Sequence, residues 1–180
     1  MIRILGLAVA AFLVGSLPSA QLVIRLAPRV PARAARIVAL LLDAVKGLIA
    51  MSFAGAGANS YAQALAATAV VAGHQWPVWR NAPRGDAGLV TAAAALSAVT
   101  PLAVPVWCVL WAAAYVASGY LALGSAAATL LLPPVLGFVA GWPFAWVVLP
   151  ACLLVLERHR REMRRILLGT ESKHYWRNEG

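Results

Sequence analysis

The sequence predicts an all-α, polytopic membrane protein: a bundle of about seven transmembrane helices in one domain. Apolar residues make up 62% of the chain and charged residues only 12%, whereas soluble domains average about 45–50% and about 25%. Residues 89–156 contain no Asp, Glu, Lys or Arg. The apolar runs also lack the alternation of barrel strands, so we expect helices, which satisfy their own backbone hydrogen bonds in lipid.

The first half of the chain predicts three spans. The first covers residues 4–26 and contains Pro18, which removes a backbone donor and is expected to kink the helix. Residues 37–56 and 61–79 form the second and third spans, which an uncharged turn connects. The N-terminal residues also imitate a secretory signal, but the apolar run continues through Leu26, which favours a retained span.

The second half predicts four further spans. Because residues 89–156 carry no charge, their breaks must be located from proline, glycine and polar residues. We expect the breaks at residues 100–105, 118–124 and 133–142. Six spans in total are the alternative, if residues 121–132 form a re-entrant half-helix, since about a dozen apolar residues are marginal for crossing a bilayer.

Arginines in the connections predict the orientation. One cluster follows the first span and another, which includes Arg84, follows the third, so both lie on one side of the membrane. With seven spans the basic C-terminal tail joins them, and basic loops favour the cytoplasm. We therefore expect residues 1–157 to form the transmembrane domain and residues 158–180 a basic, amphipathic cytoplasmic tail on anionic lipid. Membrane lipids are the expected partners; nucleic acid is not.

Two charged residues within a predicted span require an explanation. Asp43 and Lys46 each cost about 2.5–3.5 kcal/mol at the centre of a spanning helix. They lie three residues apart and share a helix face, so they form either a structural ion pair or, through Lys46, a site for an anionic substrate. His74 is similarly either a hydrogen-bonded interface residue or a catalyst. Cys108 and Cys152 have no neighbouring His or acid, so no metal site is expected.

Four short blocks of residues occur in order along the chain. They are GSLPS at 15–19, LLDAVKG at 41–47, GHQWPVW at 73–79, and a tail block with RHR at 158–160 and GTE at 169–171. Together they resemble the PlsY family, the acyl-phosphate-dependent glycerol-3-phosphate acyltransferases of bacterial plasma membranes. The resemblance covers nearly the whole chain. It implies a PlsY-like fold of seven helices with the active site toward the cytoplasm.

The resemblance also implies a reaction: transfer of a fatty acyl group from acyl phosphate to glycerol 3-phosphate, with no cofactor. Two phosphate groups must then be held beside an apolar channel, so cations and backbone N–H groups are expected to gather at the membrane surface. On the matching positions, the catalytic candidates are Ser16, His74 and His159. The candidates for binding substrate phosphates are Lys46, Arg84, Arg158 and Arg165.

The chain departs from the family pattern where phosphate binding is expected. The family's GSGNxGATNxxR stretch has no counterpart, because the connection at residues 25–39 is too short. Ala87 stands where the family's KGGKG loop has a lysine, and Asp86 beside it repels phosphate.

Because of these departures, the sequence allows three interpretations of the function. The sequence predicts a divergent PlsY-like protein of phospholipid biosynthesis. The alternative is a catalytically inactive relative that acts as a structural or lipid-binding accessory subunit and binds a membrane-protein partner. A transporter is a third interpretation, and no internal repeat supports it.

Overall fold

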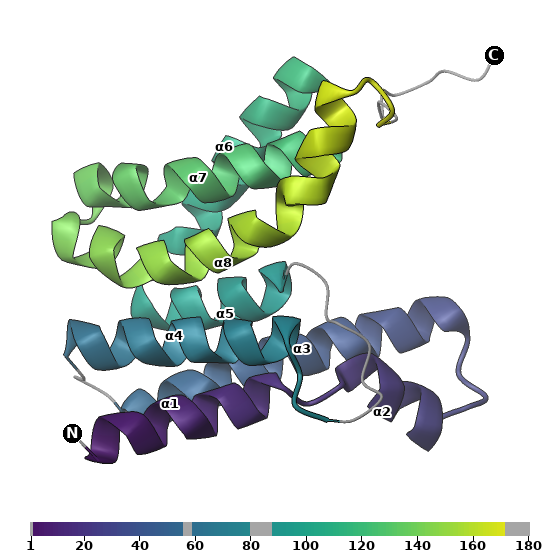
Figure 1. The fold of residues 1–180 in the computed structure, drawn as a ribbon, viewed down its shortest axis with the longest axis vertical. Helices are drawn as coiled ribbons and strands as arrows, with labels where there is room; N and C mark the ends of the chain where they lie inside the picture. Colours follow the sequence, from purple (N-terminus) through teal and green to yellow (C-terminus); the bar gives the residue numbers. More distant parts are fainter. Residues whose placement is uncertain (1, 56–58, 80–87, 172–180) are drawn as a thin grey trace.

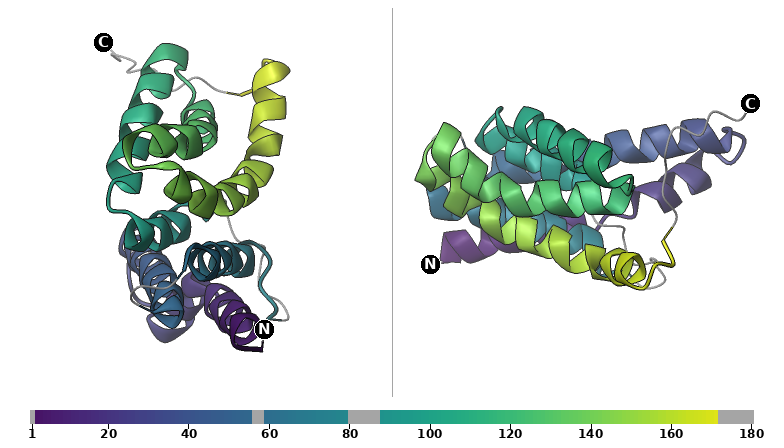
Figure 2. Two further views of the ribbon diagram at one scale, coloured as in Figure 1. Left: turned by 90° about the vertical axis from the view of Figure 1, so that its left-hand side faces the viewer. Right: turned by 90° about the horizontal axis from the view of Figure 1, so that it is seen from above.

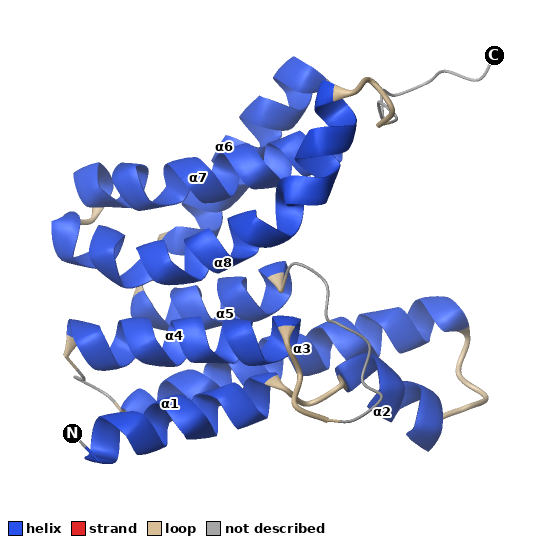
Figure 3. Cartoon of the chain, viewed as in Figure 1, coloured by secondary structure: helices blue, strands red, loops and turns tan. Residues whose placement is uncertain are grey.

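The computed structural model describes residues 2–55, 59–79 and 88–171. Every regular element in these residues is an α-helix (Figure 3). In chain order the helices are α1 (Ile2–Gly15), α2 (Ser19–Leu26), α3 (Ala32–Ala54), α4 (Ser60–Gln75), α5 (Leu89–Val99), α6 (Ala103–Ser118), α7 (Leu121–Val139) and α8 (Trp142–Leu167).

The first predicted span is broken into two helices. α1 and α2 meet at an angle of 46° across the connection that contains Pro18. Counted as one segment, they reduce the eight described helices to seven, which agrees with the predicted all-α bundle. Judged by length and composition alone, α3 and α7 can each cross a membrane, and the bent pair of α1 and α2 is a third candidate, while α5 and α6 are shorter apolar helices.

The last predicted break begins later than expected. α7 continues through Pro133 and Pro134 as far as Val139, and the turn to α8 is confined to residues 140–141. Each proline removes only one backbone donor, and helices in lipid tolerate this where neighbouring groups replace the lost bond. Gly141, with φ of 111°, supplies the turn instead. At 19 residues, α7 is long enough to cross the membrane completely.

The helices stack in layers, with α4 and α5 in the middle (Figure 1). On one side these two helices contact α1 and α3, and on the other side they contact α8; α5 also contacts α6. α7 lies between α6 and α8. The core where the layers meet consists mainly of small residues such as Ala66, Ala67 and Ala95, which are fully buried. Small side chains let membrane helices approach closely.

Two glycines fix the closest approach, which is between α1 and α4. A Cβ atom on Gly15 would collide with the backbone carbonyl of Val70, and a Cβ on Gly73 would collide with the carbonyl of Phe12. The two backbones therefore touch at this crossing. As a result, the end of α4, including His74, is held against the break between α1 and α2.

The ends of the helices divide into two groups (Figure 1). The N-terminus of α1, the start of α4 and the turn from α7 to α8 lie at the left of the view, while α2, the end of α4, the start of α5 and the end of α8 lie at the right. In Figure 2, α2 and the first half of α3 project beyond the other helices at the same end. The turn between α2 and α3 and the end of α8, which carry predicted basic clusters, therefore border one end of the bundle, and the connection with Arg84 lies outside the described residues.

Candidate functional site: a buried polar cluster and an apolar cavity

The break between α1 and α2 exposes a backbone carbonyl inside the protein. α1 ends at Gly15, and Pro18 precedes the first residue of α2, so the regular helical hydrogen bonds are interrupted. The carbonyl oxygen of Leu17 accepts a hydrogen bond of 3.1 Å from Lys46 Nζ on α3. A buried side chain thus satisfies a backbone group that the kink leaves accessible.

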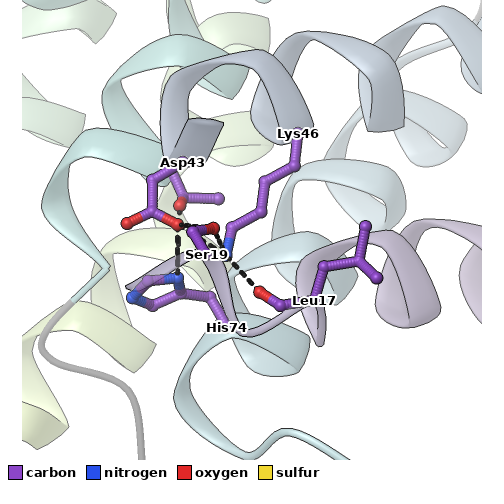
Figure 4. Close-up of polar contacts among 6 residues, drawn as sticks. Leu17, Ser19, Asp43, Lys46 and His74 are labelled. Carbon is purple, nitrogen blue, oxygen red and sulfur yellow. Dashed lines mark hydrogen bonds and ion pairs between the residues drawn. The ribbon is translucent and has the colours of Figure 1, made fainter. Parts of the chain in front are cut away.

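Four side chains from three helices form what we call the buried polar cluster: Ser19, Asp43, Lys46 and His74 (Figure 4). Lys46 Nζ lies 2.7 Å from Asp43 Oδ1. Ser19 Oγ donates a hydrogen bond of 2.7 Å to the same carboxylate oxygen. His74 Nδ1 lies 3.5 Å from it. Asp43 is 7% exposed and Lys46 is 4% exposed, so the ion pair is buried.

Lys46 has no hydrogen-bond donor to spare. An ammonium group has three donors, and Lys46 Nζ has three acceptors within 3.3 Å: Asp43 Oδ1, the Leu17 carbonyl oxygen and Ser19 Oγ. Its charge is also offset by Asp43. A phosphate group could bind Lys46 only by displacing one of these three partners.

Two residues that were not among the predicted site residues join this cluster: Ser19 through Asp43, and Thr91 through His74. Thr91 Oγ1 on α5 lies 3.5 Å from His74 Nδ1. Ser19 connects α2 to α3 by donating to Asp43. The position of Ser19 directly after Pro18 was a usable signal, because a polar side chain at a helix break in lipid usually has a partner.

Ser16 is placed differently from the other catalytic candidates. Its hydroxyl donates a hydrogen bond of 2.8 Å to the carbonyl of Phe12, one turn earlier in α1, and the residue is 1% exposed. Hydroxyls in membrane helices commonly bond to their own backbone in this way. This bond occupies the only proton of the Ser16 hydroxyl.

The remaining candidates lie at the C-terminal end of α8. His159 is buried, and its Nδ1 lies 4.0 Å from Glu162 Oε2. Arg165 Nε lies 2.7 Å from Glu171 Oε2. Arg158 belongs to the same stretch of α8, and Arg84 lies outside the described residues. The structure therefore separates the candidates into the polar cluster with Ser16 and a second group on α8.

A cavity of about 290 Å³ lies among α5, α6, α7 and α8. Its lining is formed almost entirely by apolar side chains, and the hydroxyl of Thr129 and two cysteine thiols are the exceptions. One of these cysteines, Cys108, is exposed on α6. This volume is close to the lower end of the range for small-molecule pockets.

The cavity and the polar cluster lie on different faces of α5. Val90 and Ala92 on α5 line the cavity, while Thr91 between them faces His74. On α8 the cavity is lined by Val155, and His159 follows one turn later on the same face. One end of an apolar space therefore borders the basic end of α8.

No metal centre is evident in the residues that the structure describes, because no three of their His, Cys, Asp or Glu side chains are arranged to hold an ion. Cys108 and Cys152 are both free thiols. The two cysteines line the apolar cavity and do not face the polar cluster.

Comparison with known proteins identifies the family. The family described as "Glycerol-3-phosphate acyltransferase" matches residues 27–169 of this chain. The chain belongs to this family. The glycerol-3-phosphate acyltransferase 2 of Moorella thermoacetica is 33% identical over 138 residues, which are 76% of this chain and 71% of that protein. The enzyme of Synechococcus sp. CC9902 is 38% identical over 143 residues, 76% of this chain and 69% of that protein.

Solved structures share the fold of this family member. The crystal structure of PlsY, an integral membrane glycerol 3-phosphate acyltransferase, in its lysophosphatidic acid form has a TM-score of 0.77 and 24% identity, with 94% of each chain covered. The glycerol 3-phosphate form gives a TM-score of 0.76. The chain is thus a multi-pass integral membrane protein with the PlsY fold, in a family of phospholipid synthesis.

Proposed function

We propose that this family member binds the acyl phosphate donor with its acyl chain in the cavity among α5–α8, and that it transfers the acyl group to glycerol 3-phosphate only slowly. The observation that carries this proposal is the apolar cavity of about 290 Å³ beside the basic end of α8. An acyl phosphate has an apolar tail and an anionic head, which match these two features. Cys108 both lines this space and is exposed on α6, and we propose that the tail enters from the bilayer beside it.

The anionic head of the donor would lie where the cavity meets two helix ends. α5 begins at Leu89, which lines the cavity, and its first backbone N–H groups favour an anion. His159 and Arg158 follow the cavity-lining residue Val155 along α8. In this proposal His159 is a catalytic residue, Arg158 and Arg84 supply positive charge, and Arg165 binds phosphate by leaving its partner Glu171. Ser16, Lys46 and His74 hold the scaffold together.

The reaction itself exchanges the mixed anhydride bond of the acyl phosphate for an ester bond. The hydroxyl oxygen of glycerol 3-phosphate attacks the acyl carbonyl carbon, the bond from that carbon to the phosphate oxygen breaks, and inorganic phosphate leaves while the hydroxyl proton passes to a base. Negative charge gathers on the carbonyl and phosphate oxygens. Each charge-assisted donor missing from such a site costs roughly 10²–10³ in rate. Because Ala87 replaces the lysine of the family's loop and the GSGN stretch is absent, we expect slow transfer.

A cavity-narrowing variant tests donor binding. Ala92→Leu places a larger side chain in the cavity, and Ala98→Leu makes the same change at an exposed position of α5. Radiolabelled palmitoyl phosphate should bind Ala92→Leu protein at least tenfold more weakly than wild type, and Ala98→Leu protein equally well. Equal binding by both variants would refute the assignment of the cavity. Lysophosphatidate formation should be at least about 10²-fold slower than by the Moorella relative under the same conditions.

A non-catalytic accessory subunit is the second candidate function. It is favoured by the state of Lys46, whose three donors and whose charge are all engaged within the protein. Such a protein would bind palmitoyl phosphate, form no lysophosphatidate and co-purify with a membrane-protein partner. Any turnover that depends on His159, measured with a His159→Ala variant, would exclude this candidate.

We also propose that the end of the bundle bearing the basic connections faces the cytoplasm of a bacterial plasma membrane. The arginines near α2, the start of α3 and the end of α8 border the same end (Figure 1), and short basic loops favour the cytoplasmic side. Residues 158–180 would then form a basic cytoplasmic tail, continuous with α8 as far as Leu167. Reporter fusions after Arg33 and Arg164 should report the same side of the membrane.

A further inference from the structure

The projecting pair of α2 and α3 combines positive charge with exposed apolar side chains. We define the basic hairpin as residues 22–41, which include the end of α2, the turn at 27–31 and the start of α3. Its arginines are Arg25, Arg29, Arg33 and Arg36, and all four are exposed. Residues 1–42 contain no Asp or Glu, so the hairpin has no acidic residue of its own to offset them.

These arginines have no evident role within the protein. None of them forms an ion pair with another described residue. Arg33 lies in the first turn of α3, where the helix dipole disfavours a cation. Arg25, by contrast, lies in the last turn of α2, where the helix dipole favours a cation. Four unneutralised charges on a short segment favour an anionic partner.

Large apolar side chains surround the arginines and are equally exposed. Ile24 is 62% exposed, Leu26 is 82% exposed and Ile37 is 59% exposed. Only Val23 of the apolar side chains in α2 is buried. Apolar residues mixed with arginine on a short amphipathic helix are typical of segments that lie in the headgroup layer of a membrane. An acidic soluble protein would match the charge but would leave these apolar side chains in water.

We propose that the basic hairpin lies in the headgroup layer and binds anionic phospholipids, as a lipid contact separate from the proposed donor site. The arginines pair with headgroup phosphates while Ile24, Leu26 and Ile37 enter the acyl boundary. The hairpin projects at the end of the bundle where the first spanning segment meets the second (Figure 2). It is thus placed to reach the headgroups without displacing another helix.

A fluorescent probe in the turn measures this contact locally. Cys108→Ser and Cys152→Ala remove the native thiols, and Val30→Cys, at an exposed position, carries the probe. The protein is placed in phosphatidylcholine nanodiscs that contain a small fraction of nitroxide-labelled lipid, either phosphatidylglycerol or phosphatidylcholine. Quenching should be several-fold stronger with the anionic lipid, since each arginine near an anionic surface favours it by about fivefold. The preference should decrease at high salt.

Charge-matched variants distinguish the hairpin from the general charge of the protein. R25Q/R29Q/R33Q/R36Q should abolish the preference at residue 30, whereas replacement of the same four arginines by lysine should retain it. R161Q/R164Q/K173Q/R177Q removes four positive charges from the tail and should leave the preference at residue 30 unchanged. Unchanged melting temperatures show that each variant is folded.

Three results would overturn the proposal. The first is equal quenching by the two lipids in the parent protein, and the second is an unchanged preference in the four-glutamine variant. The third is a probe that neither lipid quenches because a bound acidic protein covers the hairpin.

Discussion

The two sides of the bundle differ in their charged residues and in how tightly their helices pack. Around α1, α3 and α4 the backbones are in contact, and the charged residues neutralise one another in a buried cluster. Around α6, α7 and α8 the described helices contain no charged residue until Glu157, and they enclose an apolar cavity together with α5. One side thus holds an apolar space, while the buried cation on the other side is already paired.

In the function proposed above, two of the family's sequence blocks stabilise the scaffold and do not bind substrate. The blocks around Asp43 and His74 are those that resemble PlsY, and in this structure they supply contacts that join three helices at a break. Their chemistry is explained by the cost of burying charge and backbone in lipid. Three predictions test this division, in order of expected effect.

The largest effect is expected from Lys46→Met. It removes the cationic partner of the buried Asp43 carboxylate and one of the two donors to the Leu17 carbonyl, which keeps the bond from the Ser19 backbone N–H. Breaking a buried pair by removing one partner costs about 3–5 kcal/mol. The free energy of unfolding, measured by titration with SDS from mild detergent, should decrease by that amount. Asp43→Asn in the same chain should restore most of the loss; a single variant as stable as wild type would contradict the account.

Gly73→Val should destabilise the contact of α1 with α4. Its side chain would collide with the Phe12 carbonyl, and neither backbone can move without disturbing the cluster next to it. Overpacking of this kind typically costs about 1–3 kcal/mol. Gly6→Val is the matched control, because a Cβ at Gly6 has no neighbour within 4 Å. Thermal unfolding in detergent should separate the two variants, and equal melting temperatures would exclude a tight crossing.

A smaller effect is expected at the cavity side from Thr129→Val. Trp107 Nε1 donates a hydrogen bond of 3.1 Å to the Thr129 hydroxyl and thereby connects α6 to α7. Valine keeps the shape but removes the acceptor, so about 1 kcal/mol should be lost. If this bond is the only coupling lost, the double variant Trp107→Phe/Thr129→Val should lose less than the sum of the two single variants, by about 1 kcal/mol. A double-mutant cycle on the free energy of unfolding measures it.

The sequence was sufficient for the fold class and for part of the site. Uncharged apolar runs predict spanning helices, Pro18 predicts the broken first segment, and the spacing of Asp43 and Lys46 predicts that they share a face. Each of these is a local property of one helix. For the same reason, a local rule overestimated the effect of Pro133, since tertiary packing keeps α7 helical beyond it.

The remaining features depend on how helices cross, which no local pattern encodes. His74 reaches Asp43 because Gly15 and Gly73 bring α4 against α1, and Ser19 joins them because α2 turns back toward α3. The cavity arises from four helices that are separate in the sequence. Contacts of this kind can be predicted only when the packing of the helices is known.

The most direct measurement is the binding of radiolabelled palmitoyl phosphate to the Asp43→Asn/Lys46→Met double variant in nanodiscs. If the buried cluster is structural and the donor occupies the cavity, the folded variant should bind palmitoyl phosphate within about twofold of wild type, because no cation of the donor site has been removed. A loss of tenfold or more in folded protein would show that Lys46 holds the phosphate, since a charge-assisted hydrogen bond contributes about 1.5–3 kcal/mol, and would contradict the account.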